Sequence, residues 1–360
     1  MKSQIIYKDI PINFGDLSSS VFNELILTGQ YAQSKKIILT DENVFDHWIE
    51  YLVTNFEGLA EAEIIQIPAG EDNKVLEICS HIWNALSEYE ITRNDVLINI
   101  GGGVITDMGG FIAGTFKRGI NFINIPTSIL AQVDASVGGK TGIDLGPFKN
   151  QIGLFNEPSH VFIDPNFINT LPEIERLSGY AEMIKHGLIA DRKYWNQLTS
   201  LDLNNLPENF DEYIQASVQI KADIVTADPF EKGDRKKLNF GHTIGHAIEG
   251  FMLEIEQPIQ HGIAIAWGIL AEASIALSKK MILQEEFNEI NHFIQLKYPT
   301  IKLSPTDKPR ITKLLLNDKK NENDEINFTL LKGIGDAVIN QTASDVQINA
   351  ALDLVINPSI

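Results

Sequence analysis

Short apolar runs alternate with helical patterns over the first half of the chain. Five β-branched runs predict strands, at 35–41, 62–70, 95–103, 120–128 and 160–165. Between them lie segments such as 75–89, where Val75, Ile78 and Ile82 recur at the spacing of one helix face. Strands that alternate with helices favour a parallel sheet covered by helices, so the pattern predicts an α/β fold.

The second half of the chain is mostly helical by periodicity from Glu173 onward. The helical segments lie at 174–190, 211–225, 241–251, 262–280 and 342–356. A chain of 360 residues is also longer than one hydrophobic core usually serves. We therefore predict two domains, 1–165 and 166–360.

Composition and charge exclude several classes of protein. The formal net charge of -19 opposes general binding to nucleic acid or to an anionic membrane. Cys79 is the only cysteine, which excludes an internal disulfide and a multi-cysteine metal cluster. Neither an apolar run of bilayer length nor a signal-peptide pattern occurs, so we expect a cytoplasmic protein.

A glycine-rich turn follows the strand predicted at 95–103, in the stretch GGGVITDMGG. Glycines there let the backbone approach a pyrophosphate, and a helix N-terminus supplies free N–H donors. The usual dinucleotide fingerprint is incomplete, because Thr106 stands where its third glycine would be. A tight turn without a ligand therefore remains the alternative.

A second glycine-rich stretch, residues 126–153, carries Asp134, Lys140, Lys149 and Asn150. Exposed N–H groups and ammonium groups together suit a phosphate. The stretch is not a nucleotide-binding P-loop, because Asp134 occupies the position of the required upstream glycine. It predicts an anion site in an acidic protein.

Three histidines, His242, His246 and His261, fall within 20 residues, and Glu182 lies on a mostly apolar helical segment. Three protein ligands drawn from this carboxylate and these imidazoles would form a catalytic zinc site with an open position. The stretch HTIGH lacks the glutamate of metalloproteases, since Thr243 takes its place. Spacing alone leaves open which histidines bind a metal and which are structural.

Together these motifs resemble 3-dehydroquinate synthase, a sugar-phosphate cyclase of the shikimate pathway. The resemblance rests on GGGVITDMGGFIAGTFKRGI, PTSILAQVDASVGGKTGID, KNQIG, GYAEMIKHG and LNFGHTIGHAIE, which occur in order along the chain. It implies a Rossmann-like N-terminal domain, a mostly α-helical C-terminal domain, bound NAD, zinc or cobalt, and a homodimer. The implied reaction converts 3-deoxy-D-arabino-heptulosonate 7-phosphate to 3-dehydroquinate and phosphate.

The resemblance also implies site residues. The metal ligands would be Glu182, His242 and His261. The NAD-binding residues would be Asp41, Asn43, Glu71, Lys74, Gly102, Gly103, Asp107, Thr127 and Ser128, with Lys140 and Lys149 nearby. The substrate and catalytic residues would be Arg118, Asp134, Lys140, Lys149, Asn150, Lys185, Lys221, Arg235, Asn239, His246 and Lys332.

Roles follow from the same resemblance. Lys140, Asn150, Lys332 and Arg118 are expected at the phosphate, with Arg118 reaching into the neighbouring subunit's site; Lys221 and Arg235 are expected at the carboxylate. Lys185, Asn239 and His246 would steer protons around the ring hydroxyls. Three positions depart from the usual pattern, namely Ser128, Asp144 and Gln151. Asp144 is the departure of most consequence, because it adds a negative charge near the phosphate side.

Two rival enzymes share these features. One is a cyclitol-forming sugar-phosphate cyclase, such as a 2-deoxy-scyllo-inosose or 2-epi-5-epi-valiolone synthase, and the other is a metal-dependent polyol dehydrogenase. Arg235, Asn239 and His246 favour the carboxylate-bearing substrate over a cyclitol precursor. A catalytically dead NAD- or metal-binding regulator is the alternative outside enzymes, but every expected polar group is present.

Overall fold

The computed structural model describes residues 4–146, 148–316 and 326–357. The chain forms two compact units, Met1–Pro172 with Glu208–Ala222, and Glu173–Pro207 with Asp223–Ile360. Residues 208–222, expected in the second domain from the sequence, group with the first unit. All residues expected to bind NAD belong to the first unit, and the three expected metal ligands belong to the second.

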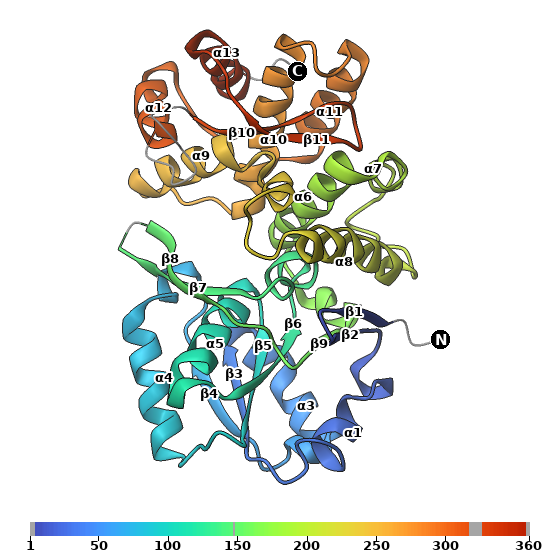
Figure 1. Ribbon diagram of the computed structural model, residues 1–360, viewed down its shortest axis with the longest axis vertical. Coiled ribbons are helices and arrows are strands. Elements are labelled where there is room, and N and C mark those ends of the chain that lie inside the picture. The colour runs from blue at the N-terminus through green and yellow to red at the C-terminus, as the bar shows by residue number, and fades with distance from the viewer. Residues whose placement is uncertain (1–3, 147, 317–325, 358–360) are drawn as a thin grey trace. The chain divides into compact units, whose positions relative to one another are not determined.

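A seven-stranded sheet forms the centre of the first unit, in the order β1-β2-β9-β6-β5-β3-β4 (Figure 1). Neighbouring strands run parallel except β1 and β2, which are antiparallel. The strands are β1 (Gln4–Tyr7), β2 (Ile10–Phe14), β3 (Lys36–Asp41), β4 (Glu63–Ile67), β5 (Val96–Gly101), β6 (Asn121–Pro126) and β9 (His160–Ile163). The five strands predicted from the sequence are all present, and the predicted α/β fold is confirmed.

Helices cover both faces of this sheet. The α-helices of this unit are α1 (Phe22–Leu27), α2 (Glu42–Val44), α3 (Glu50–Asn55), α4 (Leu76–Glu88) and α5 (Gly103–Thr115). Short 3-10 or π turns are η1 (Leu17–Ser19), η2 (Phe45–Ile49), η3 (Glu57–Leu59), η4 (Glu71–Asn73), η5 (Phe116–Arg118), η6 (Ala131–Ala135) and η7 (Pro165–Thr170).

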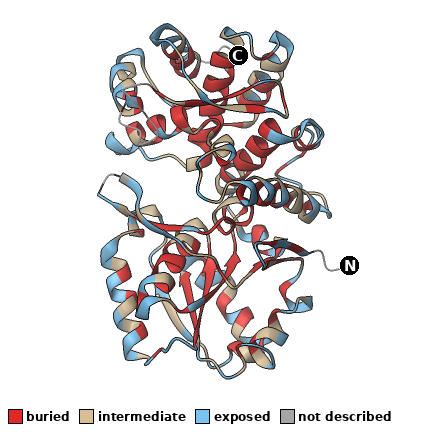
Figure 2. Ribbon diagram, viewed as in Figure 1, coloured by how far each residue is buried: buried red, intermediate tan, exposed pale blue. Residues whose placement is uncertain are grey.

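The central strands are apolar on both sides, as a covered parallel sheet requires. In β3, Ile38 packs into a core with Phe22 and Phe56, while its neighbour Ile37 packs into a second core with residues of α4 and α5. Figure 2 shows these strands as almost entirely buried. The uninterrupted β-branched runs in the sequence are explained by this two-sided burial.

Helix α5 lies unusually close to the sheet because its inner face carries small residues. A Cβ added to Gly109 would lie 2.0 Å from Oδ1 of Asn99 on β5, so only glycine fits there. Asn99 is itself buried and donates a 2.9 Å hydrogen bond to Oδ1 of Asn124 on β6. The close approach fixes the N-terminus of α5 at the carboxyl end of β5.

The glycine- and lysine-rich stretch forms an antiparallel hairpin of β7 (Lys140–Leu145) and β8 (Phe148–Phe155). Gly142 pairs with Gly153, where an added Cβ would meet the backbone of the opposite strand. The sequence analysis predicts an anion-binding stretch here but no strands. The glycines therefore serve close strand pairing as well as exposing the backbone.

The second unit is mainly helical, as predicted, with one small hairpin in addition. Its helices are α6 (Glu173–Ala190), α7 (Arg192–Thr199), α9 (His242–Glu254), α10 (His261–Ser278), α11 (Gln284–Lys297), α12 (Lys308–Leu316) and α13 (Asp345–Ile356). The hairpin is β10 (Phe328–Leu331) with β11 (Ala337–Gln341), and the short turns are η8 (Asp234–Asn239) and η9 (Pro305–Asp307). The residues of α8 (Phe210–Ala227) are divided between the two units.

Helix α10 is the core of the second unit and is apolar nearly all round. It is long and apolar enough to cross a membrane, but 78% of its apolar window is buried inside the chain. The buried carboxylate of Glu272 on α10 accepts hydrogen bonds from the N–H groups of Gly241, at 2.7 Å, and Ile244, at 3.0 Å. These bonds satisfy free N–H groups at the start of α9 and fix α9 against α10.

Candidate functional site

Glu182, His242 and His261 bring three ligand atoms together in the second unit. Oε1 of the fully buried Glu182 lies 3.6 Å from Nε2 of His242 and 3.7 Å from Nε2 of His261. The three side chains come from α6, α9 and α10. Glu182 thus converges with two histidines that follow it by 60 and 79 positions in the sequence.

The spacing fits a divalent metal ion. Ligands about 2.0–2.1 Å from a tetrahedral zinc ion lie about 3.4 Å from each other, close to the two separations found here. Oε1 of Glu182 is buried and has no hydrogen-bond partner. A buried carboxylate oxygen without a partner is costly, and a cation between these three atoms would supply one.

The other ring nitrogens of both histidines already have acceptors. Nδ1 of His242 lies 3.2 Å from the carbonyl oxygen of Phe240, and Nδ1 of His261 lies 3.1 Å from Oε2 of Glu249. A proton on each Nδ1 would satisfy these contacts and leave both Nε2 lone pairs facing Glu182. Such an outer acceptor commonly accompanies a metal-binding histidine.

The electrostatics of the cluster are set by burial and by close charges. Burial by itself would raise the pKa of Glu182, but Lys185 and the two imidazoles hold that pKa well below its usual range. Burial, reinforced by Lys185, keeps the pKa of His242 well below its usual range. Burial would also lower the pKa of His261, but Glu249 and Glu182 raise it to about 10. Without a metal, Glu182 is therefore ionised, His242 neutral and His261 protonated, so His261 would release its Nε2 proton when a metal binds.

His246 is close to both histidine ligands. Its ring centroid lies 5.1 Å from that of His242 and 5.6 Å from that of His261. Ligand atoms of all three histidines lie within 4.8 Å of one another, so a three-histidine set is geometrically possible as well. An ionised Glu182 beside His242 and His261 would favour a set that contains the carboxylate, and His246 would then lie next to that set.

The remaining expected residues of the second unit have specific partners. Lys185 forms an ion pair with Oε2 of Glu182, the oxygen that faces away from the imidazoles. The side chain of Asn239 donates a 2.6 Å hydrogen bond to Glu231, and Nη1 of the buried Arg235 donates one of 2.6 Å to the carbonyl of Pro229. Lys332 is exposed after β10, and its backbone N–H donates a 2.9 Å hydrogen bond to Asp336.

In the first unit, the residues expected at NAD lie at the carboxyl ends of adjacent strands. Asp41 ends β3, Gly102 and Gly103 follow β5, and Thr127 and Ser128 follow β6. The N–H of Thr127 donates a 3.0 Å hydrogen bond to Gly101, which ties the last two loops together. Ligands of open parallel sheets bind at this edge, and the start of α5 offers free N–H groups there.

A polar cluster beside these loops consists of the buried Lys74, the partly buried Asp107 and the exposed Asn150. Nζ of Lys74 donates hydrogen bonds of 2.7 Å to Asp107 and 2.8 Å to Oδ1 of Asn150. Burial would lower the pKa of Lys74, but Asp107 and Glu71 raise it above its usual range. Glu71 is 3.8 Å from Lys74 and 3.9 Å from Lys149. This cluster connects the loop after β4, helix α5 and the β7–β8 hairpin.

Two further predicted residues of the first unit form an ion pair. Nζ of the buried Lys221 donates a 2.6 Å hydrogen bond to Oδ1 of Asp134. Lys140 and Asn150 are exposed on the hairpin. Asn43 is exposed after β3, and its backbone N–H donates a 3.0 Å hydrogen bond to Asp41.

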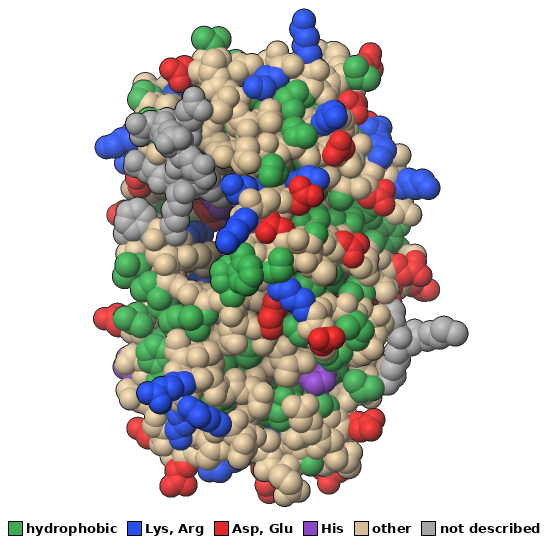
Figure 3. Space-filling view, viewed as in Figure 1, with side chains coloured by type: hydrophobic (Ala, Val, Ile, Leu, Met, Phe, Trp, Pro, Cys, Tyr) green, Lys and Arg blue, Asp and Glu red, His purple; other side chains and the backbone are tan. Residues whose placement is uncertain are grey.

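Arg118 lies apart from these groups at the end of η5. With Thr92, Arg93 and Lys117 it lines an open hollow of about 460 Å³. Lys117 and Arg118 both have a left-handed backbone, with φ of 50° and 65°. On the face drawn in Figure 3, carboxylates are scattered among lysines and arginines, so a group of three cations is a local exception in this acidic chain.

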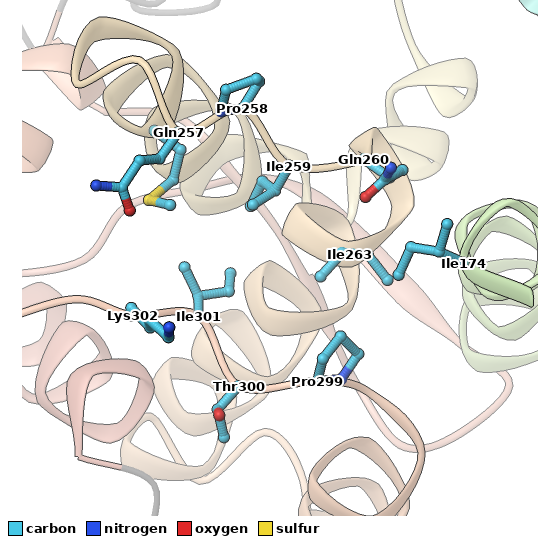
Figure 4. A pocket seen from close by; sticks show the side chains of 11 residues that line it. Ile174, Gln257, Pro258, Ile259, Gln260, Ile263, Pro299, Thr300, Ile301 and Lys302 are labelled. Carbon is cyan, nitrogen blue, oxygen red and sulfur yellow. The ribbon is translucent and has the colours of Figure 1, made fainter.

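The second unit contains a further pocket of about 290 Å³ (Figure 4). Most of its lining comes from the segment that precedes α10 and the segment that follows α11. Its lining is mainly apolar, with Ile174, Ile259, Ile263 and Ile301 pointing into it. None of the residues predicted for the site is among its lining residues. The pocket is therefore separate from the histidine cluster, although it adjoins His261 in sequence.

Sequence reasoning missed two carboxylates of this site. Glu249 contacts His261, and Glu231 accepts the hydrogen bond from Asn239. Glu249 lies three residues after His246 on the same helical segment, so helical spacing could have linked it to the histidines. Glu231 lies in a loop, and no local pattern marks it.

Comparison with known proteins agrees with the motifs. Residues 64–178 match the family described as 3-dehydroquinate synthase N-terminal, and residues 179–321 match 3-dehydroquinate synthase C-terminal. A 3-dehydroquinate synthase of Parabacteroides distasonis is 41% identical over 97% of this chain and 96% of that protein. One of Lactococcus lactis subsp. cremoris is 38% identical over 86% of this chain and 88% of that protein.

Solved structures share the fold. A 2-deoxy-scyllo-inosose synthase complexed with carbaglucose-6-phosphate, NAD+ and Co2+ is 24% identical, with a TM-score of 0.85 over 99% of both chains. A 2-epi-5-epi-valiolone synthase of Streptomyces hygroscopicus with NAD+ and Zn2+ is 23% identical, with a TM-score of 0.81 over 96% of both chains. A glycerol dehydrogenase of Schizosaccharomyces pombe is 16% identical, with a TM-score of 0.65 over 99% of this chain and 90% of its own. At these identities the likeness concerns the fold alone.

Proposed function

The chain belongs to the 3-dehydroquinate synthase family, and from this premise we propose that it converts 3-deoxy-D-arabino-heptulosonate 7-phosphate to 3-dehydroquinate and phosphate. The observation that carries the proposal is the convergence of Glu182, His242 and His261 in a chain whose relatives match it over nearly its full length. The enzyme is a phosphate-eliminating lyase that uses its coenzyme without consuming it.

NAD and a divalent ion, zinc or cobalt, are the proposed cofactors. The loops after β3, β5 and β6 would hold NAD, and Glu182, His242 and His261 would hold the metal. Bound NAD would supply a reversible hydride acceptor, and a bound metal would supply a Lewis acid for the oxygen at the oxidised carbon. The oxidation is needed because a proton next to a secondary alcohol is not acidic, whereas one next to a ketone is.

Cationic residues of the chain would hold the two anionic ends of the substrate. We assign Lys140, Asn150, Lys332 and Arg118 to the phosphate, with Arg118 acting in the neighbouring subunit of a homodimer. We assign Lys221 and Arg235 to the carboxylate, because a guanidinium can hold a carboxylate by two parallel hydrogen bonds. Asp134 keeps Lys221 in place through the ion pair described above.

Proton transfers would be handled by Lys185, Asn239 and His246. Lys185 lies next to Glu182 and His246 next to His242, so both side chains would be placed to exchange protons with a substrate bound beside the three ligand residues. The departing phosphate would itself help to remove the proton next to the ketone, so the protein would not need a separate strong base. A small phosphorylated sugar acid is the proposed partner, and the cytoplasm is the proposed location.

The test is product analysis with purified protein, catalytic NAD and zinc. Incubation with the heptulosonate phosphate is expected to release equal amounts of phosphate and 3-dehydroquinate, with no lasting absorbance at 340 nm. Phosphate release only from a sugar phosphate that lacks a carboxylate would instead identify a cyclitol synthase. Lasting NADH formation from a simple polyol would identify a dehydrogenase.

A further inference from the structure

Glu249 is a buried carboxylate that the reaction scheme leaves without a role. It lies on α9, is 6% exposed, and its Oε2 is 3.1 Å from Nδ1 of His261. Burying a carboxylate is costly unless a partner of matching charge or hydrogen-bonding capacity is present. Because Glu249 is buried on the face of α9 that packs against α10, its contact with His261 is expected to have a function.

We propose that Glu249 is a positioning residue for the metal centre. It accepts the Nδ1–H of His261, fixes the ring in the tautomer whose Nε2 faces Glu182, and makes that ring a stronger ligand. This inference rests on the proposed metal site. Glu249 does not touch the metal, and it acts only through His261.

The two imidazole ligands differ in a way that explains why His261 needs a carboxylate. His242 is held by a neutral acceptor, the carbonyl of Phe240, whereas His261 is held by a charged one. His261 is the first residue of α10, where the helix places partial positive charge. A positive field draws electron density from the imidazole, and the negative charge of Glu249 offsets it.

The surroundings restrict where the His261 ring can go. The N–H of Gly262 donates a 3.0 Å hydrogen bond to Oγ of Ser178, and a Cβ on Gly262 would lie 1.9 Å from the carbonyl oxygen of Ser178. The start of α10 is therefore fixed against α6. With that backbone fixed, the bond to Glu249 selects the ring orientation.

The experiment compares zinc affinity in the wild type, Glu249→Ala and Glu249→Gln by competition with a chromogenic chelator. Loss of an outer-shell acceptor typically weakens metal binding about 10- to 100-fold, and we expect that loss for Glu249→Ala. Glu249→Gln keeps an acceptor oxygen but loses the charge, so a smaller but measurable loss is expected. The visible spectrum of the cobalt form should shift in both variants, which reports a changed ligand geometry independently of activity.

Glu254→Gln is the matched control, because Glu254 lies on the same helix in an exposed ion pair with Arg310. It should bind zinc and cobalt as the wild type does. Near-ultraviolet circular dichroism of the metal-free proteins checks folding. If Glu249→Ala does not fold, the zinc affinity and cobalt spectrum of Glu249→Gln test the inference. Unchanged zinc affinity and cobalt spectrum in a folded Glu249→Gln would overturn the inference, whereas absence of stoichiometric zinc in the wild type would overturn the proposed metal site itself.

Discussion

The backbone N–H of Asn150 donates a 2.6 Å hydrogen bond to Oδ1 of Asp144, within the β7–β8 hairpin. Asn150 has a left-handed backbone with φ of 51°, and its side chain accepts from Lys74. Asp144 in turn donates its own N–H to the carbonyl of Lys74 at 2.8 Å. Asp144, one of the departures from the family pattern, thus holds Asn150, which is proposed to bind the phosphate.

Removing this acceptor should weaken substrate binding. Asp144→Ala deletes a hydrogen bond worth about 1 kcal/mol, so the KM for the heptulosonate phosphate should rise about fivefold. Asp144→Asn keeps an acceptor oxygen and should remain within about twofold of the wild type. Steady-state kinetics check both values. An unchanged KM in Asp144→Ala would show that Asn150 is held by other contacts.

The partly buried ion pair of Lys74 and Asp107 should matter for stability. Lys74→Met leaves Asp107 without its cationic partner, which should lower the free energy of unfolding by about 1–3 kcal/mol. Lys149→Met is the control, since Lys149 is exposed and 3.9 Å from Glu71, and its loss should cost less than about 1 kcal/mol. Urea unfolding of the two variants measures the difference. Equal free energies of unfolding for Lys74→Met and Lys149→Met would contradict this prediction and would mean that Asp107 is well solvated.

The single cysteine should be chemically inert in the folded protein. Burial raises the pKa of the Cys79 thiol from 9.0 to about 12, so the thiolate is scarce at pH 8 and increases only as the pH rises towards 12. The thiolate is the reactive form, and at pH 8 it is about one part in ten thousand. Mass spectrometry after iodoacetamide treatment should show no alkylation of the native protein and full alkylation in urea. Rapid labelling of the native protein at pH 8 would contradict this prediction.

Much of the first unit could be predicted because local pattern and burial agree there. Runs such as 95–103 are apolar at every position, and β5 is buried on both faces, so the sequence directly reflects the environment. The β7–β8 hairpin lacked such a signal. Its pairing depends on Gly142 facing Gly153, and glycine is ordinarily depleted from strands.

The proposed metal ligands could be selected as a set only through the family motifs. Spacing placed His242 and His246 on one helix face but could not rank them, because the decisive contact comes from Glu182 on another helix. The position of His261 depends on how α10 packs against α6 through Gly262 and against α9 through Gly268, because an added Cβ at either glycine would collide with the backbone of the neighbouring helix. Such close helix packing arises from tertiary structure, and local periodicity does not reveal it.

The most direct test of the account is turnover before and after removal of the metal. Chelation followed by dialysis should lower phosphate release from the heptulosonate phosphate by at least about a hundredfold, because polarising the carbonyl oxygen is worth several kcal/mol. About one equivalent of zinc or cobalt should restore the wild type but not Glu182→Gln. Undiminished turnover by metal-free protein, or full restoration of Glu182→Gln, would contradict the assignment of Glu182, His242 and His261 as the metal site.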